Sequence, residues 1–226
     1  MRVTRQGGAK LVVSEADTVV KVEVNTVLRG ALLPVRELDL CEAAQDAFGR
    51  FVSTRVVSEG ELFGGKLAAA LDRQHPRDLF DTRFILDRIN GQPDDDLRLG
   101  FLLMLLSHDR PPHEVLDPRE QDPSDAFARQ FAGMAREPFA LDDHRRAFAD
   151  LRAMLPTILP PTHRDALHAV VERADAGPFA ALAGRPEAAA LPAVSWKVEN
   201  LRRLRERDPA KDARQVEALA DVLASL

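Results

Sequence analysis

The sequence predicts an α+β protein in which a small N-terminal sheet is followed by a long helical region. The chain has 226 residues, 45% of them hydrophobic and 30% charged, which is enough for one or two globular domains. Segments rich in β-branched residues occur only before residue 58, and after it apolar residues recur at helical spacing. We therefore expect a sheet-containing domain over residues 1–58 and a helical domain over residues 59–226.

The strands are expected near the N-terminus. Residues 10–13 and 18–25 are rich in valine and flank a polar stretch of four residues, a pattern typical of an antiparallel hairpin. Alternation along the second strand places Val20, Val22 and Val24 on one face and Glu23 on the other. A third strand is predicted over residues 50–57, after a short helix around residues 37–48. Three strands form a sheet too small to be stable unless helices pack on it.

The helices follow one another from residue 61. Leu62, Phe63, Leu67 and Leu71 lie at helical spacing, and Pro76 begins a second helix because proline is favoured at the first helical position. Proline-rich stretches separate the later helices. These are predicted over residues 95–107, 124–136, 141–155, 162–174, 196–207 and 210–225.

Composition excludes several classes of protein. Cys41 is the only cysteine, so the chain has neither an internal disulfide nor a site of several cysteines for zinc or iron–sulfur clusters. The longest apolar run, residues 101–106, is far shorter than the roughly 20 residues of a membrane helix. A net charge of −5 gives no overall basic field, so nucleic acid would need a local basic patch. We expect a cytoplasmic protein without a membrane span.

One glycine-rich segment partly matches the sequence pattern of a phosphate-binding loop. Residues 60–66 satisfy the pattern G-x-x-x-x-G-K, but the next residue is Leu67, which has no hydroxyl to bind Mg²⁺. Leu62 and Phe63 belong to the apolar face of a helix. The simpler interpretation is that Lys66 is a solvated lysine on that helix.

The densest polar cluster spans residues 66–81. Asp78 falls near the third position of the helix that Pro76 begins, where a carboxylate complements the helix dipole. Arg77 and Asp81 are four residues apart and suit an ion pair on one helical face. From spacing alone a structural role is favoured for all three residues.

Two segments resemble the AbiEii-type nucleotidyltransferase toxins. They are Val-Lys-Val-Glu-Val-Asn at residues 20–25, with Leu-Arg-Gly at 28–30, and residues 58–81, which include Asp-Arg-Gln-His-Pro-Arg-Asp-Leu-Phe-Asp. Residues 106–111 and 194–201 resemble the helical C-terminal part of the same family. The resemblance covers nearly the whole chain. It implies a nucleotidyltransferase fold and a toxin of toxin–antitoxin or phage-defence systems, some of which add nucleotides to tRNA acceptor ends.

The resemblance also assigns roles to particular residues. Lys66 matches the lysine that meets the nucleoside triphosphate, and Arg77 precedes Asp78 in the family's arginine/lysine–aspartate motif as a second nucleotide-binding residue. Asp78 matches the catalytic aspartate, Asp81 the second aspartate, and Glu23 an acidic position on the central strand, a candidate catalytic residue and metal ligand. The implied cofactors are Mg²⁺ and an NTP, and the implied partners are tRNA and a cognate antitoxin protein. We expect Lys66 and Asp78 to meet in one polar cleft with Glu23 at its floor.

The chain departs from the family at its first motif. That motif is a Gly-Gly or Gly-Ser turn followed by an Asp-x-Asp pair on a strand, and no such pair occurs in that context here. The family's order places it before residue 1, so we expect the C-terminal portion of such a toxin, lacking leading strands and weakly active or inactive by itself.

Two alternative functions and one oligomeric state follow from that departure. The first alternative is a non-catalytic remnant that still binds a nucleotide, an RNA or the antitoxin, and the second is a helical scaffold without a ligand. A sheet without its leading strands exposes an unpaired edge, so we also expect a homodimer formed through the N-terminal hairpin.

Overall fold

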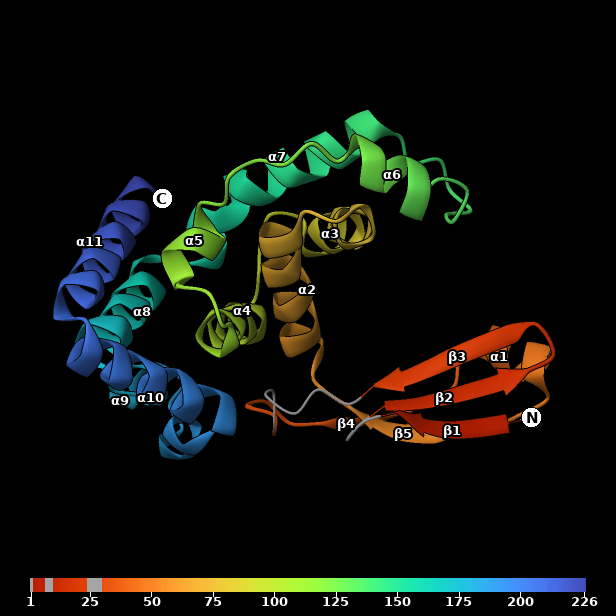
Figure 1. Ribbon diagram of the computed structural model, residues 1–226, viewed down its shortest axis with the longest axis horizontal. Helices are drawn as coiled ribbons and strands as arrows, with labels where there is room; N and C mark the ends of the chain where they lie inside the picture. Colours follow the sequence, from red (N-terminus) through yellow and green to blue (C-terminus); the bar gives the residue numbers. More distant parts are fainter. Residues whose placement is uncertain (1, 7–9, 24–29) are drawn as a thin grey trace.

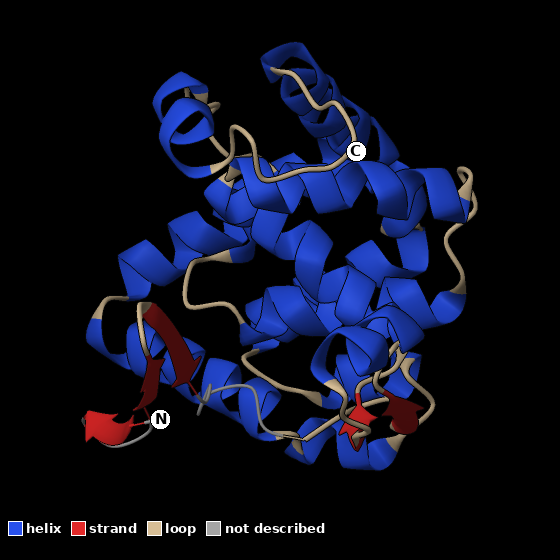
Figure 2. Cartoon of the chain, turned by 90° about the vertical axis from the view of Figure 1, so that its right-hand side faces the viewer, coloured by secondary structure: helices blue, strands red, loops and turns tan. Residues whose placement is uncertain are grey.

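The computed structural model describes residues 2–6, 10–23 and 30–226. Two small antiparallel sheets lie beside a larger body of helices, and this arrangement confirms the α+β class (Figure 1). Val24 and Asn25, at the end of the predicted second strand, lie outside the described residues. Seen from the side, helices make up most of the molecule (Figure 2).

The first sheet contains the predicted hairpin. Strands β1 (Arg2–Gln6), β2 (Lys10–Glu15) and β3 (Thr18–Glu23) are antiparallel in the order β1-β2-β3. Ala16 lies in the turn with φ +46°. The sequence analysis missed β1, which has a single apolar residue, Val3, and is defined by its pairing with β2. Pairing with a neighbour therefore outweighs the weak local pattern.

The second sheet corrects the expected position of the third strand. Strand β5 (Ser53–Val56) pairs with β4 (Arg36–Asp39) and not with the hairpin. Residues 37–39 were predicted as the start of a helix, but α1 (Glu42–Phe48) begins after them. Helix α1 ends as predicted at Gly49, which adopts φ +57°, a conformation that glycine adopts readily.

The helical region contains all the predicted helices, together with two short α-helices and a 3₁₀ helix that were missed. Many begin at a proline in the first turn, including α5 and α10, because proline suits that position. The helices are α2 (Glu59–Arg73), α3 (Pro76–Ile89), α4 (Asp95–Ser107), α5 (Pro112–Leu116), α6 (Ser124–Gln130), α7 (Leu141–Ile158), α8 (Pro161–Arg173), α9 (Gly177–Leu182), the 3₁₀ helix η1 (Pro186–Ala190), α10 (Pro192–Arg207) and α11 (Pro209–Ser225). Helix α6 ends six residues before its predicted end, and α9 is one of the two that were missed.

Helices α2 and α4 cross at very close range, and this crossing explains the glycines that resemble a phosphate-binding loop. A Cβ atom at Gly64 would lie 2.3 Å from the backbone nitrogen of Phe101, and one at Gly60 would lie 2.4 Å from the carbonyl carbon of Asp96. Around the crossing, Leu67 and Leu71 are fully buried. Gly60 and Gly64 therefore serve helix packing, and the interpretation of residues 60–66 as helix is confirmed.

The connection between the sheets and the helices depends on one buried carboxylate. Glu61 on α2 is 3% exposed, and its two oxygens accept hydrogen bonds from the backbone N–H groups of Leu32 and Leu33 at 2.8 and 3.3 Å. Both leucines are themselves buried. Helix α2 begins at Glu59, next to the expected boundary, and the division into domains 1–58 and 59–226 stays a prediction. Within the described residues no helix is long and apolar enough to cross a membrane.

Candidate functional site

The polar cluster of residues 66–81 folds into a sharp return between α2 and α3. Gln74 ends α2 in the left-handed conformation with φ +48°, and His75 precedes α3 in extended conformation. The ring nitrogen Nδ1 of His75 accepts a hydrogen bond from the backbone N–H of Arg77 at 3.2 Å, and its carbonyl accepts one from Asp78 at 2.9 Å. The chain therefore turns sharply within two residues, and the start of α3 lies beside the end of α2.

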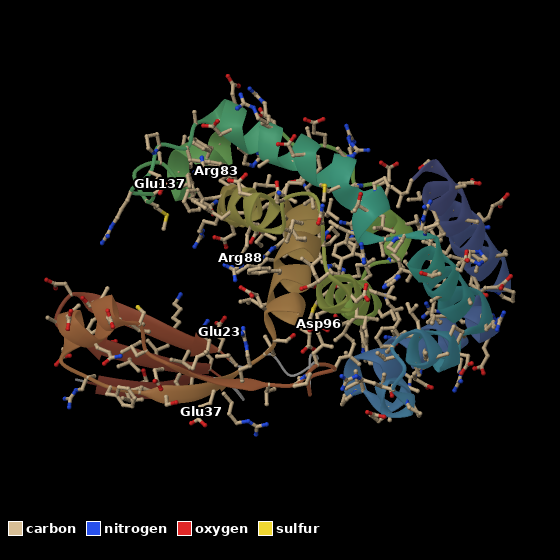
Figure 3. All side chains as sticks on the ribbon, turned by 180° about the vertical axis from the view of Figure 1, so that it is seen from behind. Glu23, Glu37, Arg83, Arg88, Asp96 and Glu137 are labelled. Carbon is tan, nitrogen blue, oxygen red and sulfur yellow. The ribbon has the colours of Figure 1, made fainter. Side chains whose placement is uncertain are left out.

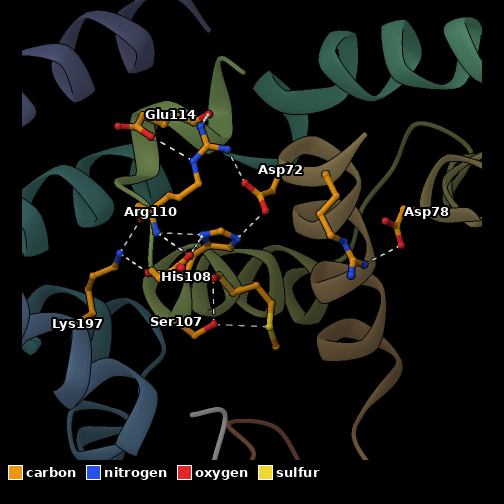
Figure 4. A network of polar contacts seen from close by, with 10 residues as sticks. Asp72, Asp78, Ser107, His108, Arg110, Glu114 and Lys197 are labelled. Atoms are coloured by element: carbon orange, nitrogen blue, oxygen red, sulfur yellow. Dashed lines mark hydrogen bonds and ion pairs between the residues drawn. The ribbon is translucent and has the colours of Figure 1, made fainter. Parts of the chain in front are cut away.

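Two ion pairs join the facing sides of these helices. Arg73 Nη2 lies 2.8 Å from Asp78 Oδ1, and Lys66 Nζ lies 2.6 Å from Asp81 Oδ2. Figure 4 shows the pair at Asp78 beside the last turn of α2. The sequence analysis offered an Arg77–Asp81 pair along α3, but the carboxylate of Asp81 is bonded across to Lys66 instead. The partner was misassigned because helical spacing says nothing about a neighbouring helix.

An open pocket of about 380 Å³ lies at this return, lined by Arg73, His75, Arg77 and Asp78. Arg77 is exposed, and its guanidinium has no partner among the described residues. The His75 ring is already engaged, because its Nε2 lies 2.9 Å from Gln130 Oε1. Two guanidinium groups therefore provide the positive charge of the pocket, and guanidinium binds phosphate in a bidentate manner.

The structure brings Lys66, Asp78 and Asp81 to one face of the α2–α3 pair but leaves Glu23 on the sheet. Glu23 lies 2.6 Å from Lys10 Nζ on β2 and is exposed. The hydrogen bond from Lys10 lowers the pKa of Glu23 below its ordinary value. In the described part of the chain, the first sheet packs substantially against neither α2 nor α3, and Figure 3 shows Glu23 on the sheet. The expected cleft with Glu23 at its floor is therefore not formed.

The three carboxylates that the resemblance places in the site are each engaged by a cation. Glu23 is paired with lysine, Asp78 with arginine and Asp81 with lysine. Within the described residues no group of three or more histidine, cysteine, aspartate or glutamate side chains could hold a metal ion. Each of these carboxylates would have to exchange its cationic partner for Mg²⁺, which binds proteins through one or two carboxylates together with substrate phosphates. The role of Glu23 as a metal ligand stays a prediction.

Sequence reasoning missed Arg73 as a site residue. It lies seven positions after Lys66, which is two helical turns, so both residues lie on the face of α2 that meets α3. That spacing could have identified it, because the two aspartates that it and Lys66 meet are three positions apart on α3.

A second polar network holds the end of α2 on the side that faces away from the pocket. Asp72 Oδ1 lies 2.6 Å from Arg110 Nη1, and Asp72 Oδ2 lies 3.3 Å from His108 Nε2 (Figure 4). Arg110 Nε also pairs with Glu114 at 3.1 Å. The hydrogen bond that Arg110 donates to Asp72 raises the pKa of Arg110 above its ordinary value. This network fixes the end of α2, where Arg73 begins the pocket, to the loop after α4.

Together these features define an α+β protein with a basic pocket at a return between two helices. The family model described as nucleotidyl transferase AbiEii toxin, type IV TA system, matches residues 2–200. The chain therefore belongs to the AbiEii nucleotidyltransferase toxin family, and the resemblance stated from its motifs is confirmed. No curated protein and no solved structure matches the chain. Membership supports a nucleotidyltransferase toxin role with an NTP substrate and a cognate antitoxin.

Proposed function

We propose that this chain takes part in transferring a nucleotidyl group from an NTP to an RNA acceptor such as tRNA in the cytoplasm. The observation that carries the proposal is the basic pocket at the α2–α3 return, which is lined by Arg77 and Asp78 of the arginine–aspartate motif together with Arg73 and His75. The guanidinium group of Arg77 is unpartnered and exposed, so it is available to a ligand. A triphosphate is the ligand that best matches several cationic groups gathered at one open pocket.

Each residue has a distinct part in this proposal. Arg77 and Arg73 bind phosphate oxygens, and Asp78 holds Arg73 in place through their ion pair. Lys66, held by Asp81, lies on the same face of α2 as Arg73 and offsets charge on the triphosphate. Mg²⁺ would accompany the triphosphate as its counterion. The carboxylates of Glu23, Asp78 and Asp81 are engaged by cations.

The experiment that tests the proposal is a transfer assay with labelled NTP, Mg²⁺ and total tRNA. The chain alone is expected to give no appreciable transfer, because Glu23 and Asp78 are paired with cations and cannot align two metal ions with an attacking hydroxyl. Joining it to the leading segment of a family member that carries the Gly-Gly turn and Asp-x-Asp pair is expected to give transfer and to arrest growth. Lys66→Ala should abolish that activity.

Two outcomes of this assay would overturn the enzymatic proposal. One is a joined protein that is folded by circular dichroism yet inactive. If it still binds NTP, the non-catalytic remnant is favoured instead. The other is strong transfer that Lys66→Ala leaves unchanged, because catalysis would then lie elsewhere in the chain.

We also propose that the chain forms a homodimer through its first sheet. All six residues of β3 are exposed, and one face of the sheet carries Val3, Leu11, Val20 and Val22, each at least 42% exposed. An apolar face of this kind marks an interaction site, and two identical faces without charges opposite one another can stack. Sedimentation equilibrium should show a dimer that Val20→Lys converts to a monomer. A wild-type monomer would contradict this proposal.

A further inference from the structure

A second pocket, of about 240 Å³, lies between α5, α8, α10 and α11 and is separate from the α2–α3 return. Its floor is Lys197 on α10, which is 5% exposed. The wall includes the half-buried ring of Trp196, and the prolines before and within α5 complete it. Val171, Leu201 and Leu204 add apolar lining, and the donor side chains in the lining are His113, Asn200, Lys211 and Gln215.

Lys197 is a buried ammonium group whose hydrogen-bond acceptors are backbone carbonyls, and its Nζ lies 6.0 Å from the centroid of the Trp196 ring. Its Nζ donates hydrogen bonds to the carbonyl oxygens of His108 and Arg110, the latter at 2.9 Å (Figure 4). Among the described residues no carboxylate pairs with it. The only acidic side chain in the pocket lining is Asp109, which is 82% exposed and bonded to His108 at 3.1 Å. The two carbonyl oxygens therefore satisfy two of the three N–H groups of the ammonium group.

A buried charge without a counter-ion is costly, and an anion in the pocket would compensate for it. Burial lowers the pKa of Lys197 to about 8, so the amine still carries its proton at neutral pH. Lys211 on α11 adds a second positive charge at the edge of the pocket. The side chains of Asn200 and Gln215 have no partner among the described residues, so they are also available as donors.

We propose that this pocket binds a small organic anion, with a carboxylate or phosphate group on Lys197 and a flat apolar part against Trp196. The pocket is smaller than the roughly 300–1,000 Å³ typical of sites for drug-sized ligands, which limits the ligand to a compact molecule. An aromatic face suits a flat apolar group, and ammonium and amide donors suit a single anionic head group. The site is independent of the nucleotide pocket, with which it shares no lining residue.

Trp196 makes the proposal directly measurable, because it is the only tryptophan in the chain. Its fluorescence can be followed while the protein is titrated with phenyl phosphate, benzoate or inorganic phosphate. Phenyl phosphate or benzoate is expected to give a saturable change, and comparing the two identifies the preferred head group. Inorganic phosphate is expected to bind more weakly, because it lacks the flat part that contacts the indole ring.

Matched variants locate the binding. Lys211→Gln and Lys197→Met are each expected to weaken it about tenfold or more, since each removes a charged donor. Arg207→Gln removes a positive charge from an exposed residue at the end of α10, outside the pocket, and should leave binding unchanged. Lys211 is exposed, so its variant is expected to fold even where the loss of the buried lysine impairs folding.

The pH dependence gives an independent readout. Binding should weaken as the pH rises through about 8, because Lys197 then loses its proton. The other titratable groups facing it are Asp109, His113 and Lys211, and α8 contributes only Val171 to the lining. Burial lowers the pKa of His113, so this ring is already neutral in that range. The absence of a saturable signal with all three probes, or equal affinity in Lys211→Gln and wild type, would overturn the proposal.

Discussion

Gly64→Ala is expected to lower the free energy of unfolding by about 3 kcal/mol or more, which is the upper end of the usual cost of overpacking. The added Cβ would lie 2.3 Å from the backbone nitrogen and 2.8 Å from the Cα of Phe101, so a backbone segment of α4 must move. Both helices belong to the main core, where Leu67 and Phe101 are fully buried. Thermal and urea denaturation followed by circular dichroism would measure the loss.

The neighbouring glycine provides the control. A Cβ at Gly65 would lie 3.5 Å from the sulfur of Met104, an ordinary contact with a flexible side chain. Gly65→Ala should therefore be neutral, or stabilising by up to about 1 kcal/mol through helix propensity. If Gly64→Ala and Gly65→Ala lowered the free energy of unfolding equally, the close crossing of α2 and α4 would not be the reason for the glycine at position 64.

Glu61→Leu is expected to cost about 2 kcal/mol or more and to loosen the segment that leads from the sheets into the helices. The substitution leaves the N–H groups of Leu32 and Leu33 buried without an acceptor, and each orphaned donor costs about 1–3 kcal/mol. Hydrogen exchange at these two amides should accelerate more than exchange in the α2–α4 core. Chemical denaturation gives the global cost.

Glu61→Gln separates the lost acceptors from the altered packing. The amide keeps one oxygen that can accept from Leu32, whose bond at 2.8 Å is the shorter of the two. Its cost should therefore be clearly smaller than that of the leucine variant. Unchanged exchange at Leu32 and Leu33 in Glu61→Leu would contradict the role given to this carboxylate.

The helices could be predicted from sequence to a greater extent than the sheets, for a physical reason. Helical periodicity is local, so Leu62, Phe63, Leu67 and Leu71 identify α2 without knowledge of its neighbours. A strand is completed by its partner, as β1 shows: one valine among polar residues gives little pattern of its own. The first turn of α10 was missed because Pro192 marks both a loop and a helix start.

The candidate site was predictable as a set of residues but not as a geometry. The family motif identified Lys66, Arg77, Asp78 and Asp81. Arg77 and Asp78 line the pocket at the α2–α3 return, and Lys66 and Asp81 pair across the same two helices. Which of these residues pair with one another depends on how the two helices face each other. Spacing along a single helix gives no information about that. Glu23 was placed by resemblance alone, and its position depends on a sheet whose packing no local pattern specifies.

The central claim is that the basic pocket at the α2–α3 return binds a nucleoside triphosphate, and isothermal titration of the chain with NTP tests it most directly. We expect measurable binding that Arg77→Gln weakens about tenfold or more, because a charged phosphate contact is lost. The control Arg214→Gln removes an equally exposed charge from α11 and should bind as the wild type does. No binding of any NTP, or equal binding by wild type and Arg77→Gln, would contradict the assignment of this pocket.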